Sequence, residues 1–118
     1  MIDLNRMIQE LRKHTDYHGM GMIASHLGIV RGTSLNGQAV MGIQVMFNDK
    51  IVNEIIREIK YMPGIIDVLV ETNDGRLDVG DDIMAVVVGG DTREHVFPAL
   101  VAAVEHIKTR AVEKTELC

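Results

Sequence analysis

The chain has 118 residues, 47% of them hydrophobic, and a formal net charge of −5 at pH 7. This size and apolar content predict one folded domain over residues 1–118, and the negative charge argues against nucleic acid or an anionic membrane as a general partner. The longest apolar run, 83–88, is too short to cross a bilayer, and the amino terminus lacks the pattern of a signal peptide, so we expect a cytoplasmic protein. The sole cysteine, Cys118, excludes an internal disulfide and a cysteine-rich metal cluster.

The first part of the chain predicts a helix followed by a β-hairpin. Apolar residues recur on one helical face within residues 3–13, behind Asp3, which can cap the helix. Residues 22–32 form a β-type run, and residues 39–47 form a second one. The intervening 33–38 contains an Asn-Gly pair, a frequent hairpin turn, so these two strands are predicted to pair with each other.

The middle of the chain predicts a second helix and two more strands. Asn48 can cap a helix that the Met-Pro-Gly at 62–64 closes. Its apolar side chains fall along one stripe, which consists of Ile51, Val52, Ile55, Ile56 and Ile59. Residues 64–72 alternate as a strand, the Asn-Asp-Gly-Arg at 73–76 is typical of a turn, and 83–88 is apolar enough for a central strand buried on both faces.

A last helix is predicted near the carboxyl end, with a conflict at its start. Asp91 and Glu94 have the spacing of a capping box, and apolar residues continue to Ile107. Pro98 conflicts with a smooth start, so either the first turn is irregular or the regular helix begins at Pro98. The succession of helix, hairpin, helix, two strands, helix and short tail predicts an α+β fold with helices packed on a sheet.

The histidines give little support to a metal site. His14 and His18 have the i, i+4 spacing of metal ligands, but no third ligand is evident, and a polar helix end is the favoured interpretation. His26 lies within a predicted strand, where we expect a hydrogen-bonded sheet residue rather than a ligand. No metal site is therefore predicted, and no glycine-rich phosphate loop stands out.

Four cations occupy positions from which an anion site can be built. Arg31 ends a strand, Arg93 opens the last helix, Lys108 lies fifteen residues further along that helix, and Lys114 follows in the tail. If folding brings them together, guanidinium groups can bind phosphate and ammonium groups can transfer protons. The competing interpretation is that each is an exposed, solubilising charge, and spacing alone favours it.

Four segments occur in the order and approximate spacing of a known family. They are GMIASHLGIVRG (21–32), GRLDVGDDIMAVVV (75–88), TREHVFPA (92–99) and IKTRAVEKTE (107–116). With these segments the chain resembles the catalytic (large) subunit of molybdopterin synthase, from Gly21 to Glu116. No single segment is decisive, and the resemblance rests on their collinearity.

The resemblance implies an α/β-hammerhead-type fold, a homodimer, and a small ubiquitin-like sulfur carrier as partner, together a heterotetramer. In that family the Gly-Gly tail of the carrier ends in a thiocarboxylate and enters a pocket of the large subunit. Two sulfurs are donated to cyclic pyranopterin monophosphate, which generates the dithiolene of molybdopterin. No cofactor and no metal are predicted for this chain.

The resemblance also assigns roles to five residues. Arg31 and Arg93 match arginines of the family's anion-binding pocket, and Thr92 stands beside Arg93 where the family usually has a histidine. Lys108 matches the lysine at the end of the last helix, and Lys114 matches the second lysine of the tail. The lysines are the implied catalytic residues, which transfer protons and hold the thiocarboxylate. The other three are implied to bind the substrate.

The chain departs from the family pattern in three places. Thr92 replaces a histidine, and Thr72-Asn73 replace a His-Arg pair. Val112-Glu113 stand where the family has a Pro-aromatic-Trp element that is one residue longer. On a continuous helix this deletion rotates Lys114 by about 100° relative to Lys108, whereas an extended tail absorbs it. The resemblance therefore leaves open a divergent enzyme or a non-catalytic, partner-binding relative.

An alternative from another functional class rests on residues 48–116. The helix, the YMPGIIDVLVETNDGRLD segment at 61–78, a strand and another helix look similar to small βαββαβ regulatory domains that bind amino acids at dimer interfaces. That likeness explains neither the Val-Arg-Gly strand end nor the lysine-bearing tail. The synthase subunit is therefore the preferred interpretation.

Overall fold

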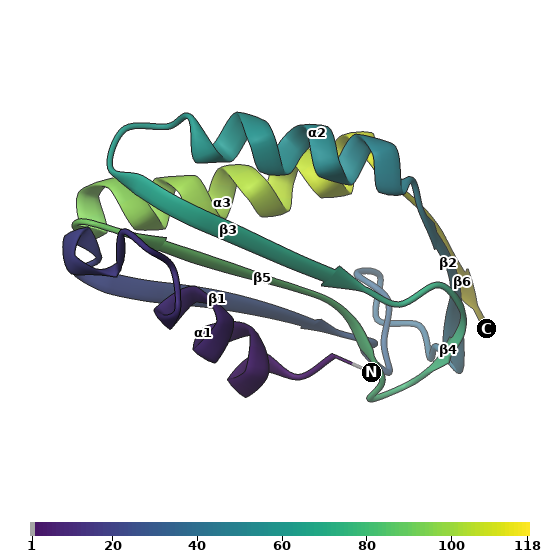
Figure 1. Cartoon of the computed structure of the whole chain (residues 1–118). Helices are drawn as coiled ribbons and strands as arrows, with labels where there is room; N and C mark the ends of the chain where they lie inside the picture. The colour runs from purple at the N-terminus through teal and green to yellow at the C-terminus, as the bar shows by residue number, and fades with distance from the viewer. Residues whose placement is uncertain (1) are drawn as a thin grey trace.

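Two antiparallel sheets of three strands each form the framework of the protein (Figure 1), which a computed structural model describes over residues 2–118. The first sheet has the order β1-β5-β3, with bounds Met22–Ile29, Asp82–Gly90 and Ile65–Thr72. The second sheet has the order β4-β2-β6, with bounds Gly75–Asp78, Gly42–Phe47 and Val112–Leu117. The predicted α+β class is confirmed.

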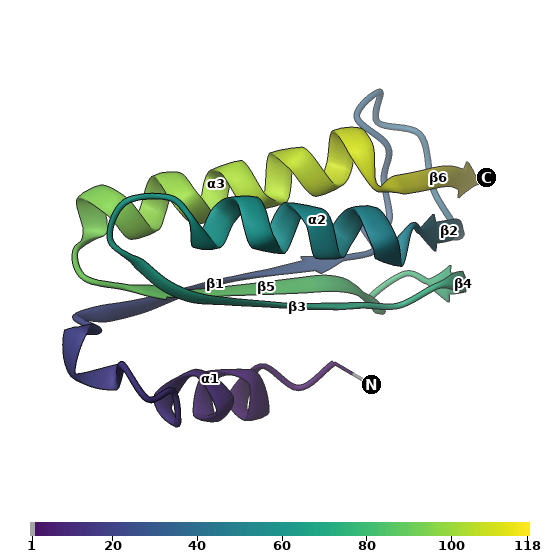
Figure 2. The same ribbon diagram turned by 45° about the horizontal axis from the view of Figure 1, so that its top comes forward.

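Helices cover both faces of the first sheet. They are α1 (Leu4–Arg12), α2 (Asp49–Lys60) and α3 (Arg93–Arg110), and a short 3-10 turn, η1 (Tyr17–Gly19), connects α1 to β1. Figure 2 shows α2 and α3 side by side on one face of the sheet and α1 on the opposite face. The helices predicted at 3–13 and after Asn48 are confirmed, with slightly shorter bounds.

The central strand β5 joins two apolar layers, because successive side chains of a strand point to opposite faces. Val86 and Val88 belong to the larger cluster with α2 and α3, whereas Ala85 and Val87 belong to a smaller cluster with Leu11 of α1. These four residues of the nine in β5 are fully buried. The predicted central strand, buried on both faces, is confirmed.

The predicted hairpin between the strands at 22–32 and 39–47 is wrong. Strand β1 pairs with β5, while β2 pairs with β4 and β6 in the other sheet. The Asn-Gly pair does form a tight turn, in which Gly37 has a φ of 82° and Gln38 N donates to Ser34 Oγ at 3.1 Å. This turn closes only a loop, because pairing with the central β5 buries more apolar surface than an isolated two-stranded hairpin.

The predicted turn at 73–76 is only partly a turn. Asn73 and Asp74 leave β3, but Gly75 begins β4, in which Leu77 is buried in the larger cluster. The partner of β4 is β2, whereas β3 pairs with β5. Between β3 and β5, which are neighbours in the first sheet, the chain therefore contributes β4 to the second sheet. The turn-like residues at 73–76 do not reveal this.

Helix α3 begins at Arg93, and Pro98 lies inside it, so the first turn is helical despite the proline. The predicted capping box is wrong, because the cap residue is Thr92 rather than Asp91. Asp91 Oδ1 instead accepts a hydrogen bond from Thr92 N at 2.6 Å and lies 2.7 Å from His95 Nδ1. The hydrogen bond with His95 lowers the pKa of the Asp91 carboxyl.

Replacing Asn48 by alanine should destabilise the protein through the start of α2. The Asn48 side-chain oxygen accepts a hydrogen bond from Ile51 N at 3.2 Å, which satisfies a backbone donor that the helix cannot. Loss of such a cap costs about 1 kcal/mol of the free energy of unfolding, measurable by urea titration. Asn53→Ala is the matched control, because Asn53 is an exposed residue within the same helix. Equal losses in the two variants would contradict the capping role.

Candidate active site

A groove of about 1000 Å³ opens where both sheets meet the carboxyl end of α3. Strands β1, β2, β5 and β6, the loop after β1 and the last turns of α3 contribute its walls. Buried members of the larger core cluster form its apolar lining, namely Val30, Ile43, Val45, Phe47 and Met84. Three of the five predicted site residues line it together: Arg31, Lys108 and Lys114.

Arg31 lies two residues after the end of β1, near the start of the loop that borders the groove. Its Nε donates to the carbonyl of Thr33 at 2.9 Å, which fixes one edge of the guanidinium. Among residues 2–118, no carboxylate lies within ion-pair distance of this group. Its two terminal nitrogens are therefore available as a fork for an anion such as phosphate.

The two lysines reach the groove from different elements. Lys108 occupies the last turn of α3, whereas Lys114 lies on β6, opposite Val45 of β2. Helix α3 ends at Arg110, so the tail is extended and the one-residue deletion imposes no helical rotation on Lys114. Alternation along β6 points Val112, Lys114 and Glu116 to the same face, which lines the groove.

Arg110, the third cation between residues 108 and 114, forms an ion pair with another helix and has a structural role. Its Nη1 and Nη2 donate to the two carboxylate oxygens of Glu58 on α2 at 2.9 and 2.8 Å. The hydrogen bonds from Arg110 lower the pKa of the Glu58 carboxyl. This bidentate pair ties the end of α3 to α2 and so helps to fix the turn that carries Lys108.

The charge of the groove favours an anionic ligand. Arg31, Lys108 and Lys114 face a single carboxylate, Glu116, although the whole chain is acidic. Within the described part of the chain, neither lysine takes part in an ion pair. A local excess of positive charge in a partly enclosed groove attracts anions more strongly than the same charges spread over a surface.

His26 also lines the groove, and sequence reasoning missed it as a site residue. Its Nε2 is buried and has no hydrogen-bond partner within residues 2–118, so the expectation of a hydrogen-bonded sheet residue is wrong. Burial and the nearby charge of Lys108 lower the pKa of the imidazole. One feature of the sequence could have indicated this, namely the position of His26 within its strand. His26 lies on the same face of β1 as Ala24 and Gly28, and that face points to the larger core cluster.

Arg93 and Thr92 do not lie in this groove. They stand at the amino end of α3, and the fifteen residues from Arg93 to Lys108 span about 22 Å of helix. Arg93 Nε lies 3.6 Å from Glu94 Oε1, and both side chains are largely exposed. Within one copy of the chain, the predicted substrate-binding residues therefore lie at two places, Arg31 in the groove and Thr92 with Arg93 at the amino end of α3.

The family model described as MoaE protein matches residues 1–110. The chain belongs to the MoaE family. It is similar to a molybdopterin synthase structure from Staphylococcus aureus, with 20% identity, a TM-score of 0.80, and 98% of this chain and 85% of that chain covered. A molybdopterin cofactor biosynthesis protein E from Burkholderia multivorans is 29% identical, with a TM-score of 0.78 and coverage of 98% and 80%. A Helicobacter pylori complex of subunits 1 and 2 of molybdopterin-converting factor contains a chain that is 16% identical, with a TM-score of 0.72 and coverage of 98% and 78%.

Membership of the MoaE family confirms the resemblance found in the four collinear segments, and with it a large-subunit role in molybdenum cofactor biosynthesis. The match covers residues 48–110, on which the regulatory-domain alternative largely rested, and the strands of that stretch are divided between two sheets. Lys114 lies beyond the matched residues, so its assignment rests on its place in the groove. No curated protein matches the chain. Over residues 2–118, no helix is both long and apolar enough to span a membrane.

Thr72 and Asn73, which replace a His-Arg pair of the family pattern, also lie outside the groove. Thr72 ends β3, opposite Met84 of β5. Asn73 Nδ2 donates to the carbonyl of Asp82 at 2.8 Å, and Asn73 N donates to the carbonyl of Ile83 at 2.9 Å. Asn73 thus closes the end of the first sheet, which gives it a structural role in this chain.

The histidines at 14 and 18 do not form a metal site in the described residues, where no group of three or more His, Cys, Asp or Glu side chains is suitably placed. His14 Nδ1 accepts a hydrogen bond from Asp16 N at 3.0 Å, and its Nε2 lies 4.0 Å from Asp67 Oδ2. The ring of His18 packs against Tyr17, with ring centroids 4.0 Å apart. Both side chains therefore serve the turn between α1 and β1.

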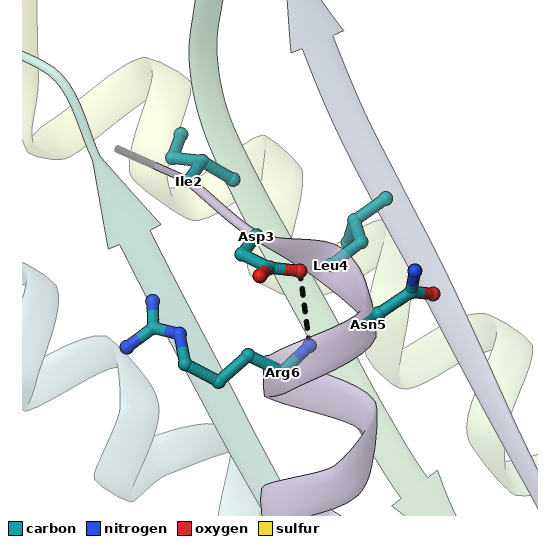
Figure 3. Close-up of a pocket in the computed structure, with 5 residues that line it drawn as sticks. All are labelled: Ile2, Asp3, Leu4, Asn5 and Arg6. Carbon is teal, nitrogen blue, oxygen red and sulfur yellow. Dashed lines mark hydrogen bonds between the residues drawn. The ribbon is translucent and has the colours of Figure 1, made fainter.

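A second hollow, of about 440 Å³, lies at the start of α1 and is lined by residues 2–6 (Figure 3). Asp3 Oδ1 accepts a hydrogen bond from Arg6 N at 3.1 Å, which caps the helix. Arg6 Nη2 is held by both carboxylate oxygens of Glu71 at 2.7 and 2.6 Å. These polar groups already have partners, and no predicted site residue lies there, so the hollow is a helix cap rather than a candidate active site.

Proposed function

We propose that this MoaE-family chain carries out the sulfur transfer of a molybdopterin synthase, with a thiocarboxylated carrier as donor and cyclic pyranopterin monophosphate as acceptor. The observation that supports this proposal is the convergence of Arg31, Lys108 and Lys114 on one groove of about 1000 Å³. That volume suits a small-molecule ligand together with a narrow peptide tail such as Gly-Gly. The protein acts in the cytoplasm as a homodimer with two carriers, a heterotetramer.

The chemistry requires anion binding and proton transfer. In each sulfur transfer the thiocarboxylate sulfur displaces an oxygen from a carbon of the pterin side chain, which forms a thioester between carrier and pterin. Water then hydrolyses the thioester, so that the sulfur stays on the pterin and the carrier tail leaves as a carboxylate. Arg31 holds the phosphate, because its guanidinium fork matches two phosphate oxygens. Lys108 and Lys114 hold the thiocarboxylate and supply the protons that the departing oxygen needs. Two such transfers give the dithiolene.

Arg93 and Thr92 can take part only if a second copy of the chain brings them to the groove. Arg93 and Lys108 are about 22 Å apart along one helix, so they cannot serve the same groove within one copy. A homodimer in which two copies share each site is compatible with the prediction that Arg93 binds the substrate. In a closed dimer each copy then lends its Arg93 to the groove of the other. Each groove would combine Lys108 of one copy with Arg93 of its partner.

Mixing two inactive variants tests this shared site. Lys108→Ala and Arg93→Ala homodimers should each be inactive, whereas refolding them together at equal amounts should restore about a quarter of wild-type turnover, because half of the dimers are mixed and each has one intact site. If both residues serve the same groove of one chain, no mixed dimer contains an intact site. Failure to recover activity, with mixed dimers confirmed by mass spectrometry, contradicts the shared site.

The direct test of the proposed function is to mix the purified chain with thiocarboxylated carrier and cyclic pyranopterin monophosphate. Molybdopterin is quantified by its fluorescent oxidised derivative, and carrier binding is measured in parallel by calorimetry. We expect product at a rate that depends on the amount of the chain. Carrier binding without product would instead identify a partner-binding relative, with Thr92 in place of a histidine as the first residue to restore.

A further inference from the structure

One ring nitrogen of His26, a residue that lines the groove, has no hydrogen-bond partner in the described part of the chain. Its Nε2 is the only buried side-chain nitrogen or oxygen without a hydrogen-bond partner in the described part of the chain. Buried polar atoms in folded proteins nearly always have partners, because an unpaired one is costly. Its isolation against the apolar lining of a ligand-sized groove therefore calls for a reason.

The surroundings of His26 provide space and an electrostatic setting for a ligand. Gly28, two residues along the same face of β1, has no side chain, and a Cβ added there would lie in van der Waals contact with His26 Nε2, at 3.5 Å, so the glycine leaves that position beside the ring free. Charged groups come from three of the walls: Arg31 after β1, Lys108 on α3, and Lys114 with Glu116 on β6. The groove thus holds three cations and one carboxylate around an imidazole that has no protein partner.

Burial and the nearby charge of Lys108 both lower the pKa of the His26 ring, which favours its neutral form at neutral pH. A neutral imidazole offers one hydrogen-bond donor and one acceptor. An anion bound beside Lys108 offsets the positive charge that disfavours the imidazolium, so the ring gains a proton more easily. Anion binding and proton uptake are then linked, and the anion binds more tightly as the pH falls.

We propose that His26 contacts the ligand of the groove: its ring hydrogen-bonds the anionic group held by Arg31 and Lys108, and it takes up a proton from solvent when that group binds. The identification of the natural anion as a thiocarboxylate or a phosphate rests on the proposed function. The contact itself needs only an anion in the groove. His26 therefore supplies the site with an imidazole, the side chain whose ordinary pKa lies nearest neutral pH.

The first experiment follows the imidazole rings by NMR through a pH titration, with and without sulfate at constant ionic strength. Sulfate is the probe because it does not titrate in this pH range. The titration midpoint of His26 should rise by about half a unit or more with sulfate, whereas the ring signals of His18, in the turn before β1, should be the same with and without sulfate. An unchanged His26 midpoint, or no sulfate-dependent shift of Lys108 signals, overturns the proposal.

Two substitutions separate ligand contact from a structural role. His26→Phe removes both ring nitrogens but keeps an aromatic ring, so it should raise the midpoint of thermal unfolding by about 4 °C, since a buried unpaired atom is lost. The same variant should bind sulfate about tenfold more weakly at pH 6, because a hydrogen bond to an anion is lost. His26→Gln keeps a donor but not the proton uptake, so its sulfate affinity should no longer depend on pH between 5 and 7.

These results stand apart from the fate of the proposed function. If His26→Phe binds sulfate as tightly as the wild type with the same pH dependence, His26 does not contact the anion. A lower unfolding midpoint in His26→Phe would assign the residue to packing and also contradict the proposal. Failure of the wild-type chain to form molybdopterin, with the sulfate results as expected, would leave the anion contact intact and overturn only the sulfur-transfer reaction.

Discussion

Replacing Lys108 by alanine should lower molybdopterin formation by at least about 100-fold, because one cation and one proton-transferring group leave the groove together. The side chain is exposed and takes part in no ion pair among residues 2–118, so the free energy of unfolding should change by less than about 0.5 kcal/mol. Product is measured by fluorescence and stability by urea titration. Lys50→Ala, at an exposed position on α2, is the matched control and should keep full activity.

Lys108→Arg distinguishes charge from proton transfer at the same position. Arginine keeps the positive charge but does not give up a proton near neutral pH. If Lys108 mainly transfers protons, the arginine variant should bind the carrier with nearly wild-type affinity and still form little product. Wild-type turnover in Lys108→Ala would contradict the assignment of the catalytic site to this groove.

The sequence identified Arg31, Lys108 and Lys114 through collinear segments, and the fold places all three on the same groove. These three residues were identified although the predicted topology was wrong. The two strands of the predicted hairpin do not pair with each other and belong to different sheets. Pairing between β1 and β5 joins residues about sixty positions apart, and no local pattern encodes such a partner. The positions of cations at element ends were therefore more informative than the pairing of those elements.

Arg93 and His26 illustrate two further limits of sequence reasoning. Arg93 was grouped with the groove residues because it matches an arginine of the family's anion-binding pocket, yet the length of α3 keeps it at the other end of the helix from Lys108. His26 was taken as an ordinary sheet residue, because the partner of a strand side chain depends on what lies across the fold. Neither the distance between two groups held apart by a helix nor the absence of a hydrogen-bond partner can be deduced from spacing along one chain.

Replacing Leu11 by alanine should cost about 2 to 5 kcal/mol of the free energy of unfolding, the range for a large aliphatic side chain removed from a packed interior. Leu11 is 0% exposed and packs with Met7, Ala85 and Val87 in the smaller cluster beneath the sheet. Leu35→Ala is the control, since Leu35 is 92% exposed, and its effect should stay within about 0.5 kcal/mol. Urea titration of both variants gives the comparison.

The position of Leu11 makes this variant informative about function as well. Helix α1 covers the face of the first sheet opposite α2 and α3, whereas the groove is lined by members of the larger cluster (Figure 2). At a temperature where Leu11→Ala remains folded, its turnover should stay within about twofold of the wild type, because the groove residues keep their supports. A loss of stability below about 1 kcal/mol would mean that α1 packs less tightly than its buried side chains indicate. A loss of turnover as large as that of Lys108→Ala would show instead that the two faces of β5 are coupled, since Ala85 and Val87 alternate along that strand with Val86 and Val88.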